Sequence, residues 1–510
     1  MWEENKLSKL QEKLNIIKEG GGKEKQEAQH KKGKLTARER IDYLFDKGTF
    51  HEINAFMEPE YDAFGNRKPF LGDGVVTGYG EIDGRTCFVS AQDYTVAGGS
   101  LGAAHGKKIC KIMDMALEMR CPYITLNDSG GARIEEGITG LNEYAGIFRR
   151  NTRLSGVVPQ IAAVLGPCAG GVCYSAAICD YIFMTEEKSQ MYITGPSVVK
   201  AVIGEDVTVD ELGGARVHTE ESGVAHFSYL DDKSCLDGVK KLLSFLPNND
   251  ETPSEITEYK GKDKSKKIYD IVPDNSKKSY DVRDVINAVF DENSLFEVQK
   301  NFAPNIVVGF ARLGGKSVGV VANQPAVLGG SLDIDASDKS ARFVRFCDSF
   351  RIPVITLVDV PAFMPGTKQE KGGIIRHGAK LLYAYAEATV PKITLIMRKA
   401  YGGAYIAMNS KSLGADLVLA WPTAEIAVMG ASGAVEIIGK RQIAAAEDKE
   451  AKRAELIAEY NERFVNPYSA AGSGVIDEVI FPEETRERLL ASLKMLETKL
   501  KGERHGNIPL

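Results

Sequence analysis

The feature that most constrains this chain is a pattern that occurs in it twice. Gly98-Gly99-Ser100-Leu101 recurs as Gly329-Gly330-Ser331-Leu332, at an offset of 329 − 98 = 231 in the numbering. The segment 120–128 recurs as 351–359 at the same offset, with its Arg, Pro, Ile, Thr, Leu and Asp preserved in order. Repeated turn chemistry in unrelated domains would not hold one offset over so many anchors. The sequence therefore predicts two copies of one domain.

The offset changes at two points along the chain. Residues 38–52 match 283–297 at an offset of 245, and Gly170-Gly171 match Gly402-Gly403 at an offset of 232. The fall from 245 to 231 predicts 245 − 231 = 14 extra residues in the first copy, around Glu58 to Phe70.

The length of 510 residues also requires more than one domain, because single hydrophobic cores stop growing at about 250–300 residues. The junction between the copies is polar and rich in lysine and proline, as is typical of a linker. We therefore expect an N-terminal domain over 1–250, a linker over 251–280 and a C-terminal domain over 281–510.

Strand and helix signals alternate in each copy, which predicts an α/β fold with helices packed on largely parallel strands. Apolar runs indicate strands at 86–91, 123–126 and 161–165, and again at 318–322, 354–358 and 393–397. Helical spacing is found at 107–119 and 339–350, and shorter helices are expected at 172–178 and 404–408.

A Gly-Gly turn follows the last of these strands in each copy, at Gly170-Gly171 and at Gly402-Gly403. A strand-to-helix turn of this kind leaves backbone N–H groups without intrahelical partners, and glycine lets a ligand oxygen approach them closely. Such donors can hold an oxyanion. Tight packing that merely needs small residues is the competing interpretation, and spacing alone leaves both open.

Two other motifs are expected to be structural. Gly98–Gly102 fits the G-x-S-x-G nucleophile pattern, but no strand immediately precedes it and the second copy has Asp333 in place of the last glycine. Gly314–Ser317 resembles the end of a phosphate-binding loop, but Phe310 stands where that motif needs glycine, so a hairpin turn is predicted.

Composition excludes several classes of protein. A net charge of −6 argues against a nucleic-acid binder, and no apolar run is long enough to cross a membrane. The eight cysteines contain no CxxC pair and the seven histidines show no metal spacing, so no bound metal is expected. His105, His226 and His377 are expected to be structural, and Lys107, Lys108, Arg133 and Arg376 to be solvated charges. Buried thiols and the absence of a signal segment indicate a cytoplasmic protein.

Several longer strings resemble the biotin-dependent acyl-CoA carboxyltransferases, and the resemblance runs from about residue 5 to the end. These strings are Gly33–Ile41, Asn127–Gly137, Gly166–Gly171, Thr194–Pro196, Leu332–Asp338, Gly372–Gly378, Arg398–Tyr405 and His505–Leu510. The chain is most similar to propionyl-CoA carboxylase β subunits, methylmalonyl-CoA decarboxylase α subunits and the carboxyltransferase part of transcarboxylase.

The resemblance implies a crotonase-like spiral (ClpP/crotonase type) in each half and a homohexamer built as a trimer of dimers. It also implies an active site between the N-terminal domain of one subunit and the C-terminal domain of another. The first half would hold acyl-CoA and the second half biotin. The family's oxyanion residues fall on Gly170 and Gly171 for the thioester, and on Gly403 and Ala404 for the ureido oxygen of biotin.

Three further positions take a role from the same resemblance. Gly131 and Ala132 match a substrate-binding loop of crotonase-like folds. Ile406 stands where many propionyl-specific members have Asp, at a position that bears on the choice of acyl chain. The presence of Ile406 therefore favours the decarboxylase and transcarboxylase branch of the family over the propionyl-specific members.

The implied cofactor is biotin on a separate biotin carboxyl carrier protein, because the chain has no Ala-Met-Lys-Met motif. Biotin carboxylase or membrane decarboxylase subunits are the other expected partners, and a coenzyme A thioester is the substrate. Two rival functions stay open at this point: a crotonase-type hydratase or isomerase that acts alone, with Glu135 and Glu136 as candidate acids, and a scaffold without catalysis.

Overall fold

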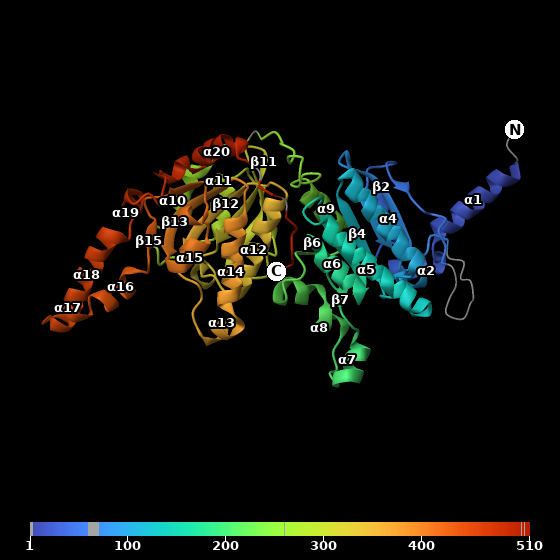
Figure 1. The fold of residues 1–510 in the computed structure, drawn as a ribbon, viewed down its shortest axis with the longest axis horizontal. Coiled ribbons are helices and arrows are strands. Elements are labelled where there is room, and N and C mark those ends of the chain that lie inside the picture. Colours follow the sequence, from blue (N-terminus) through green and yellow to red (C-terminus); the bar gives the residue numbers. More distant parts are fainter. Residues whose placement is uncertain (1–3, 60–70, 260, 501, 504, 510) are drawn as a thin grey trace. The chain divides into compact units, whose positions relative to one another are not determined.

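Parallel strands flanked by helices build both halves of the chain (Figure 1). The computed structural model describes residues 4–59, 71–259, 261–500, 502–503 and 505–509. Its backbone contacts divide the chain into two compact units, which meet in sequence at Pro253 and Ser254. Unit 1 contains the chain up to Pro253 together with His505–Pro509, and unit 2 contains Ser254–Arg504.

These units differ in their bounds from the domains expected at 1–250 and 281–510. Most of the expected linker, 251–280, lies in unit 2, where α10 (Ile268–Ile271) has formed. The C-terminal residues return to unit 1, and the Asn507 N–H donates to Ser155 Oγ at 2.8 Å. The carbonyl of His505 lies so close to Gly156 that a β-carbon there would be 2.1 Å away. Dividing the sequence once at the linker therefore assigns His505–Pro509 to the wrong unit.

The sheet of unit 1 has the strand order β1-β2-β3-β4-β5-β6-β8, and β7 pairs with β5. From β3 onward the pairs are parallel, while β1, β2 and β3 are antiparallel. Its strands are β1 (His51–Glu52), β2 (Val75–Ile82), β3 (Arg85–Gln92), β4 (Tyr123–Ser129), β5 (Gln160–Ala169), β6 (Tyr181–Thr185), β7 (Gln190–Tyr192) and β8 (Phe227–Tyr229).

The sheet of unit 2 repeats this arrangement in the order β9-β10-β11-β12-β13-β14-β16, with β15 paired to β13. Its strands are β9 (Phe296–Val298), β10 (Ile306–Leu313), β11 (Lys316–Asn323), β12 (Val354–Val360), β13 (Lys392–Tyr401), β14 (Leu417–Ala420), β15 (Glu425–Ala427) and β16 (Glu478–Val479).

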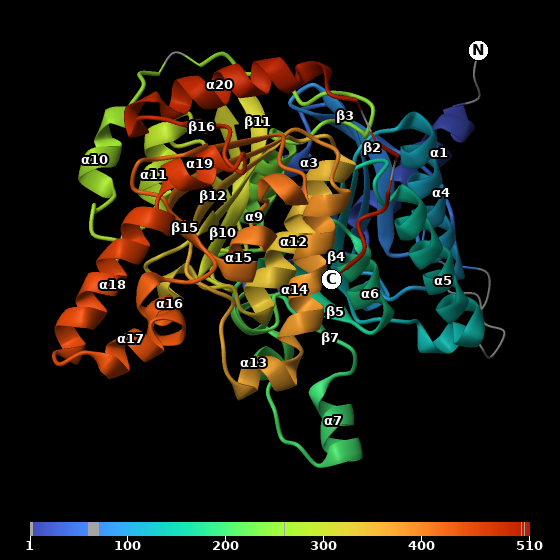
Figure 2. The same cartoon turned by 60° about the vertical axis from the view of Figure 1, so that its left-hand side comes forward.

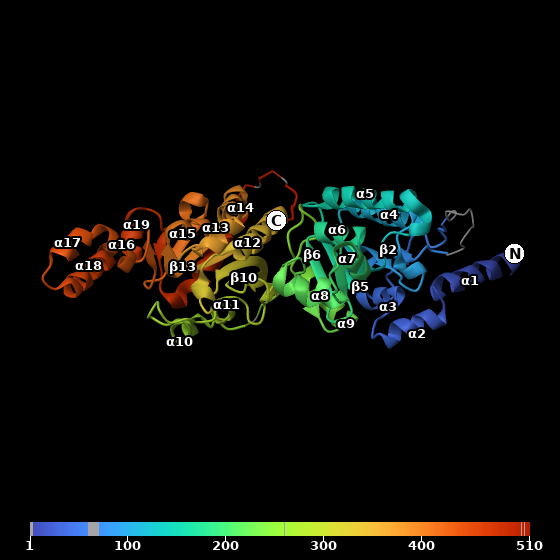
Figure 3. The same ribbon diagram turned by 90° about the horizontal axis from the view of Figure 1, so that it is seen from below.

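Helices cover both faces of each sheet, as Figure 3 shows for α4 and α5 on one side of unit 1 and α3 and α9 on the other. The helices of unit 1 are α1 (Glu4–Glu19), α2 (Lys23–Lys31), α3 (Ala37–Leu44), α4 (Ala103–Met119), α5 (Gly137–Leu154), α6 (Gly171–Ile178), α7 (Pro196–Ile203), α8 (Val209–Gly213) and α9 (Asp232–Leu243). Because both faces are covered, central strands are buried along their whole length rather than at alternate residues, and β4 and β6 are buried at every residue.

In unit 2, α12 and α14 lie side by side on the sheet (Figure 2). The helices of this unit are α10, α11 (Val282–Val289), α12 (Ile334–Ser349), α13 (Thr367–Gly372), α14 (Ile374–Glu387), α15 (Gly402–Ala407), α16 (Ala431–Ile438), α17 (Lys440–Ala445), α18 (Lys449–Phe464), α19 (Pro467–Gly472) and α20 (Thr485–Met495). Buried residues of α11, α20 and β10–β13 form one apolar cluster of the core, and further buried apolar residues come from α12 and α14.

The predicted duplication and α/β class are confirmed by these elements. The offset is 306 − 75 = 231 between the starts of β2 and β10, and 392 − 160 = 232 between those of β5 and β13. Between the starts of α3 and α11 it is 282 − 37 = 245, so the change of offset falls between β1 and β2. Most of the extra residues predicted near Glu58 to Phe70 lie outside the described part of the chain.

The two copies neutralise one buried carboxylate in different ways. Asp128, at the end of β4, is paired with Lys34 and Arg40, while its counterpart Asp359 is paired with Arg398 of β13. Residue 398 − 232 = 166 is glycine in the first copy, and a β-carbon at Gly166 would lie 2.1 Å from Asp128 Oδ1. The cations therefore come from α3 and the residues just before it in one copy, and from the sheet in the other.

The hairpins β2–β3 and β10–β11 confirm the turn predicted at Gly314-Gly315. The corresponding glycines, Gly84 and Gly315, have φ of +73° and +80°. Added β-carbons would meet nothing within 4 Å at Gly84, but the Thr257 carbonyl oxygen at 1.8 Å at Gly315. A left-handed backbone alone costs an alanine about 1–2 kcal/mol.

We therefore expect Gly84→Ala to lower the free energy of unfolding by about 1–2 kcal/mol and Gly315→Ala to lower it by clearly more. The extra loss has a physical reason, since the Thr257 backbone must move and its hydrogen bond to the Gly315 carbonyl is disturbed. Urea unfolding of both variants against the parent protein measures the difference. Equal losses in the two variants would contradict the close contact.

Candidate active site

The carboxyl ends of β4 and β5 bring the expected first site together. β5 ends at Ala169, Gly170 turns the chain with φ +69° and ψ −131°, and α6 begins at Gly171. Because that φ lies in a region that L side chains rarely adopt, glycine is required at position 170. Sheets of this type place ligands at the carboxyl ends of their strands.

The N–H of Gly170 is already used inside the protein. It donates to the Tyr192 carbonyl oxygen of β7 at 3.0 Å, as part of the pairing between β5 and β7. Gly171 and Val172 are the first two residues of α6, where helix geometry provides no intrahelical acceptor for the N–H. The donors offered by this turn are therefore those of Gly171 and Val172, and Gly170 shapes the turn.

The second site is built from the corresponding turn of unit 2, although its helix begins one residue earlier in the repeat, at Gly402. Gly402 has φ +57°, and α15 runs from Gly402 through Gly403 and Ala404 to Ala407. At the offset of 232, Gly403 aligns with Gly171 and Ala404 with Val172, since 403 − 171 = 404 − 172 = 232. The expected donors of the second half thus correspond to Gly171 and Val172 of the first half. The sequence analysis did not name Val172 as a donor, although the offset of 232 aligns it with Ala404.

The space over the two turns differs. A β-carbon on Gly171 would lie 2.7 Å from the ring of Tyr144, a residue of α5 that packs against this turn. A β-carbon on Gly403 would meet nothing within 4 Å, and Gly403 is exposed. Gly171 is thus needed for packing as well as for approach, whereas the face of Gly403 is open to a ligand.

Gly131 and Ala132 lie beside the first turn. A β-carbon on Gly131, which has φ +102°, would be 3.1 Å from the carbonyl oxygen of Ala169. The loop is tied to Leu101, whose N–H donates to the Gly131 oxygen at 2.8 Å and whose oxygen accepts from the Arg133 N–H at 2.9 Å. Since Leu101 bonds the residues on either side of Ala132, the Ala132 N–H and C=O point away from Leu101. The structure thus brings both expected parts of the first site together.

The three histidines singled out in the sequence offer little acid–base chemistry. His105 is buried, and burial together with Arg133 and Lys108 holds its pKa well below the usual value, so it is neutral. His226 accepts from the Ile182 N–H, and His377 pairs with Asp338 at 2.7 Å. These partners agree with structural roles for the three histidines. The described residues contain no group of three or more potential metal ligands.

Two of the charges that were expected to be solvated are buried. Lys108 donates to the carbonyls of Gly72 and Val75, and burial lowers its pKa to about 8. Arg133 is also buried, and it forms an ion pair with Asp73. Lys107 and Arg376 are exposed, as expected. The prediction of solvated charge was wrong for Lys108, which bonds to loop carbonyls, and for Arg133, which bonds to a buried carboxylate. The sequence around each residue does not reveal these partners.

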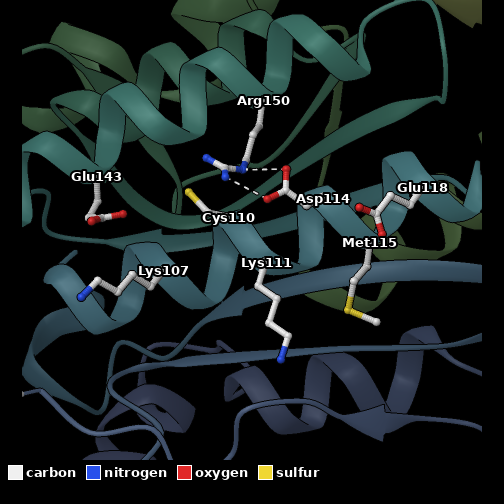
Figure 4. Close-up of a pocket in the computed structure, with 8 residues that line it drawn as sticks. All are labelled: Lys107, Cys110, Lys111, Asp114, Met115, Glu118, Glu143 and Arg150. Carbon is white, nitrogen blue, oxygen red and sulfur yellow. Dashed lines mark hydrogen bonds and ion pairs between the residues drawn. The ribbon is translucent and has the colours of Figure 1, made fainter.

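A shallow depression of about 440 Å³ lies between α4 and α5 rather than at the turns (Figure 4). Its lining holds three cations and three carboxylates. Arg150 and Asp114 form a bidentate ion pair at 2.8–2.9 Å, and the other four are Lys107, Lys111, Glu118 and Glu143. Nothing in this lining selects a ligand, so the glycine turns remain the candidate site.

Ile406 lies on α15, two residues after Ala404, and is 40% exposed. Its side chain can therefore meet a ligand near the second turn. All eight cysteines are free thiols, and seven of them are buried. Among the described residues, no helix is long and apolar enough to cross a membrane.

A glycine turn that leads into a helix in each half of a duplicated α/β chain is the arrangement expected of enzymes that stabilise oxyanions with backbone N–H groups. The chain is a member of the carboxyl transferase domain family, which it matches over residues 28–508. It is a carboxyltransferase with two crotonase-like domains in tandem, as expected.

Relatives of known name cover the whole chain. It is 56% identical to the propionyl-CoA carboxylase carboxyltransferase subunit of Haloferax mediterranei and 53% identical to the methylmalonyl-CoA decarboxylase α subunit of Propionigenium modestum, over 99% of each chain. A crystal structure of transcarboxylase 12S, a hexamer with methylmalonyl-CoA and methylmalonic acid bound, is 50% identical and superposes with a TM-score of 0.97. That match covers 100% of this chain and 99% of the other.

Proposed function

We propose that this chain moves a carboxyl group between biotin on a separate carrier protein and the α carbon of a short acyl-CoA, most directly the propionyl-CoA and methylmalonyl-CoA pair. The observation that carries the proposal is the glycine turn at the start of a helix in each half, where backbone N–H groups without intrahelical acceptors can hold two different oxyanions. Relatives named for propionyl-CoA and methylmalonyl-CoA support the acyl chain.

In this proposal the first turn holds the thioester oxygen. Removing the α proton of an acyl-CoA, or its carboxyl group, places negative charge on that oxygen. The N–H groups of Gly171 and Val172 are the donors for this charge, Gly170 sets the turn, and Gly131 and Ala132 line the acyl-CoA beside it. Donors fixed before the reaction stabilise the developing charge without reorganisation.

The second turn takes the ureido oxygen of biotin, with Gly403 and Ala404 as donors. The open face of Gly403 leaves room for a ligand, because a β-carbon there would meet no side chain, and no backbone beyond that of its own helix and chain neighbours, within 4 Å. Carboxybiotin, when bound, would supply the carboxyl group and the base, so the proposal requires no side chain to act as the base. The role of the protein is then to position the two substrates and to stabilise the oxyanions that form on them. Ile406, beside this turn, is proposed to influence the choice of acyl chain.

We also propose a homohexamer in the cytoplasm, with unit 1 as the acyl-CoA half and unit 2 as the biotin half. The hexameric transcarboxylase 12S supports the assembly, and the free buried thiols support the compartment. A biotin carboxyl carrier protein is required as a partner. Biotin carboxylase or membrane decarboxylase subunits would decide whether the cell uses carboxylation, decarboxylation or transfer.

The test mixes the purified chain with methylmalonyl-CoA and either free biotin or a biotinylated carrier. Propionyl-CoA is expected to form only when biotin is present, and chromatography of the CoA esters measures it. Inactivity with both acceptors would overturn the proposal. Hydration of crotonyl-CoA without biotin would instead support a crotonase-type hydratase.

A further inference from the structure

The loop that carries Gly131 and Ala132 is held by a buried ionic network. Arg133, only 5% exposed, directly follows Ala132. Its Nη1 contacts Asp73 Oδ1 at 2.5 Å and Glu136 Oε1 at 2.8 Å, and its Nη2 donates to the Ser100 carbonyl at 2.8 Å. Every contact of this guanidinium fixes the position of the residue next to Ala132.

Both carboxylates of the network are anchored in turn. Asp73 is fully buried and its Oδ2 accepts from the His105 N–H at 2.9 Å, while Glu136 Oε2 accepts from the Ala103 N–H at 2.6 Å, in the first turn of α4. Because His105 is neutral, it adds no charge that would compete with Arg133. Gly102 leaves room for the network, since a β-carbon there would lie 2.3 Å from Glu136 Oε1. The loop is thus braced against α4 and the residues before β2.

The second copy shows that the network is not needed for the fold. Leu332 makes the same backbone bridge, and its carbonyl accepts from the Met364 N–H at 2.7 Å, where 364 − 133 = 231. The carbonyl of Ser331, the counterpart of Ser100, accepts from the neutral amide of Asn305 at 2.8 Å. The backbone bridge and one neutral amide therefore suffice to build this loop in the second copy, and the ionic network is specific to the first copy.

We propose that Arg133, braced by Asp73 and Glu136, is a positioning residue that fixes the Ala132 peptide for the acyl-CoA thioester. This inference rests on the proposed function, in which the Gly131–Ala132 loop meets acyl-CoA. Fixing the loop keeps its backbone groups in register with those of Gly171, and a misplacement of about 1 Å in such a site can cost about 10²-fold in rate.

The test uses Arg133→Met and the triple variant Asp73→Asn/Arg133→Met/Glu136→Gln. The triple variant leaves no unpaired buried charge, so it is the one expected to fold well. We expect its kcat/KM for methylmalonyl-CoA to fall by about 10²-fold, with the KM for biotin unchanged and faster hydrogen exchange at residues 130–136. Arg133→Lys, which keeps the charge, is expected to recover part of the activity.

A matched control is the buried pair Arg486–Asp291 of unit 2, in which Arg486 Nη2 lies 2.5 Å from Asp291 Oδ1. Arg486→Met/Asp291→Asn should change stability without changing kcat/KM for methylmalonyl-CoA. If the triple variant loses only stability and keeps the parent kinetic constants and exchange rates, the positioning role is overturned. If the parent protein itself lacks biotin-dependent activity, the proposed function fails instead, and the two failures are thereby distinguished.

Discussion

Replacing Gly403 by proline is expected to lower carboxyl transfer between biotin and acyl-CoA by about 10²–10³-fold, the cost of losing one oxyanion donor. Proline has no N–H, and the second residue of α15 has no intrahelical acceptor for one, so the helix itself loses no hydrogen bond. Because Gly403 lies in the half proposed for biotin, acyl-CoA binding should be retained. Steady-state formation of propionyl-CoA and calorimetric binding of methylmalonyl-CoA measure the two effects separately.

Gly403→Ala is the matched control for this experiment. It keeps the N–H, and its β-carbon meets no protein atom within 4 Å. We expect the alanine variant to retain far more activity than the proline variant, at equal thermal stability. Proline also restricts the residue before it, here Gly402 with φ +57°, so circular dichroism and melting temperature must match the parent. Near-normal turnover of a well-folded Gly403→Pro variant would remove this N–H from the mechanism.

Replacing Arg398 by methionine is expected to lower the free energy of unfolding of unit 2 by about 3–5 kcal/mol, the usual cost of breaking a buried ion pair. Arg398 Nε lies 2.8 Å from Asp359 Oδ2, and each side chain is only 1% exposed. Its Nη1 also donates to the carbonyls of Pro273, Asn275 and Lys278, which holds the segment before α11 against the sheet. The variant therefore loses an ion pair and a set of backbone contacts together.

The loss in Arg398→Met should depend on pH. Burial already raises the pKa of Asp359, and removing the arginine raises it further. A carboxyl group with a raised pKa in the folded state favours folding when protonated, and this contribution is lost as pH rises through the folded-state pKa. The variant is therefore expected to be closer to the parent at pH 5 than at pH 8, in urea unfolding curves followed at both values.

Two control variants test whether the loss in Arg398→Met comes from the unpaired Asp359. The double variant Arg398→Met/Asp359→Asn removes the unpaired charge, so it should recover part of the stability and lose the pH dependence. Lys200→Ala breaks the exposed pair Lys200–Asp206 and should change stability by no more than about 0.5 kcal/mol. A pH-independent loss in Arg398→Met would show that Asp359 is not the group left uncompensated.

The fold could be predicted well from the sequence because each element is indicated independently in both copies of the repeat. The strands at 161–165 and 393–397, the Gly-Gly turns and the hairpin at Gly314-Gly315 all follow from local rules that apply in each copy. Periodicity and turn chemistry depend on neighbours in the chain, so they can be read without tertiary contacts. The family resemblance added chemistry that these rules do not contain.

The details of the site depended on contacts between distant residues. The pairing of Ala169 with Tyr192 explains why Gly170 has no N–H to offer, and it moves the donors to Gly171 and Val172. The ring of Tyr144 explains why Gly171 must be glycine while Gly403 lies open. Arg133 and Lys108 were expected in solvent because their partners are distant in the sequence. Arg133 pairs with Asp73, and Lys108 donates to the carbonyls of Gly72 and Val75.

By itself the sequence determined that this chain is a duplicated α/β carboxyltransferase with a Gly-Gly turn in each half, since repeats, turns and motifs are properties of residue order. Only the tertiary structure decided which N–H groups remain free at each turn, which cation neutralises Asp128 and Asp359, and what braces the Ala132 loop. These depend on which side chains and carbonyls meet across the fold, and a buried polar group is satisfied by whatever partner the packing brings to it.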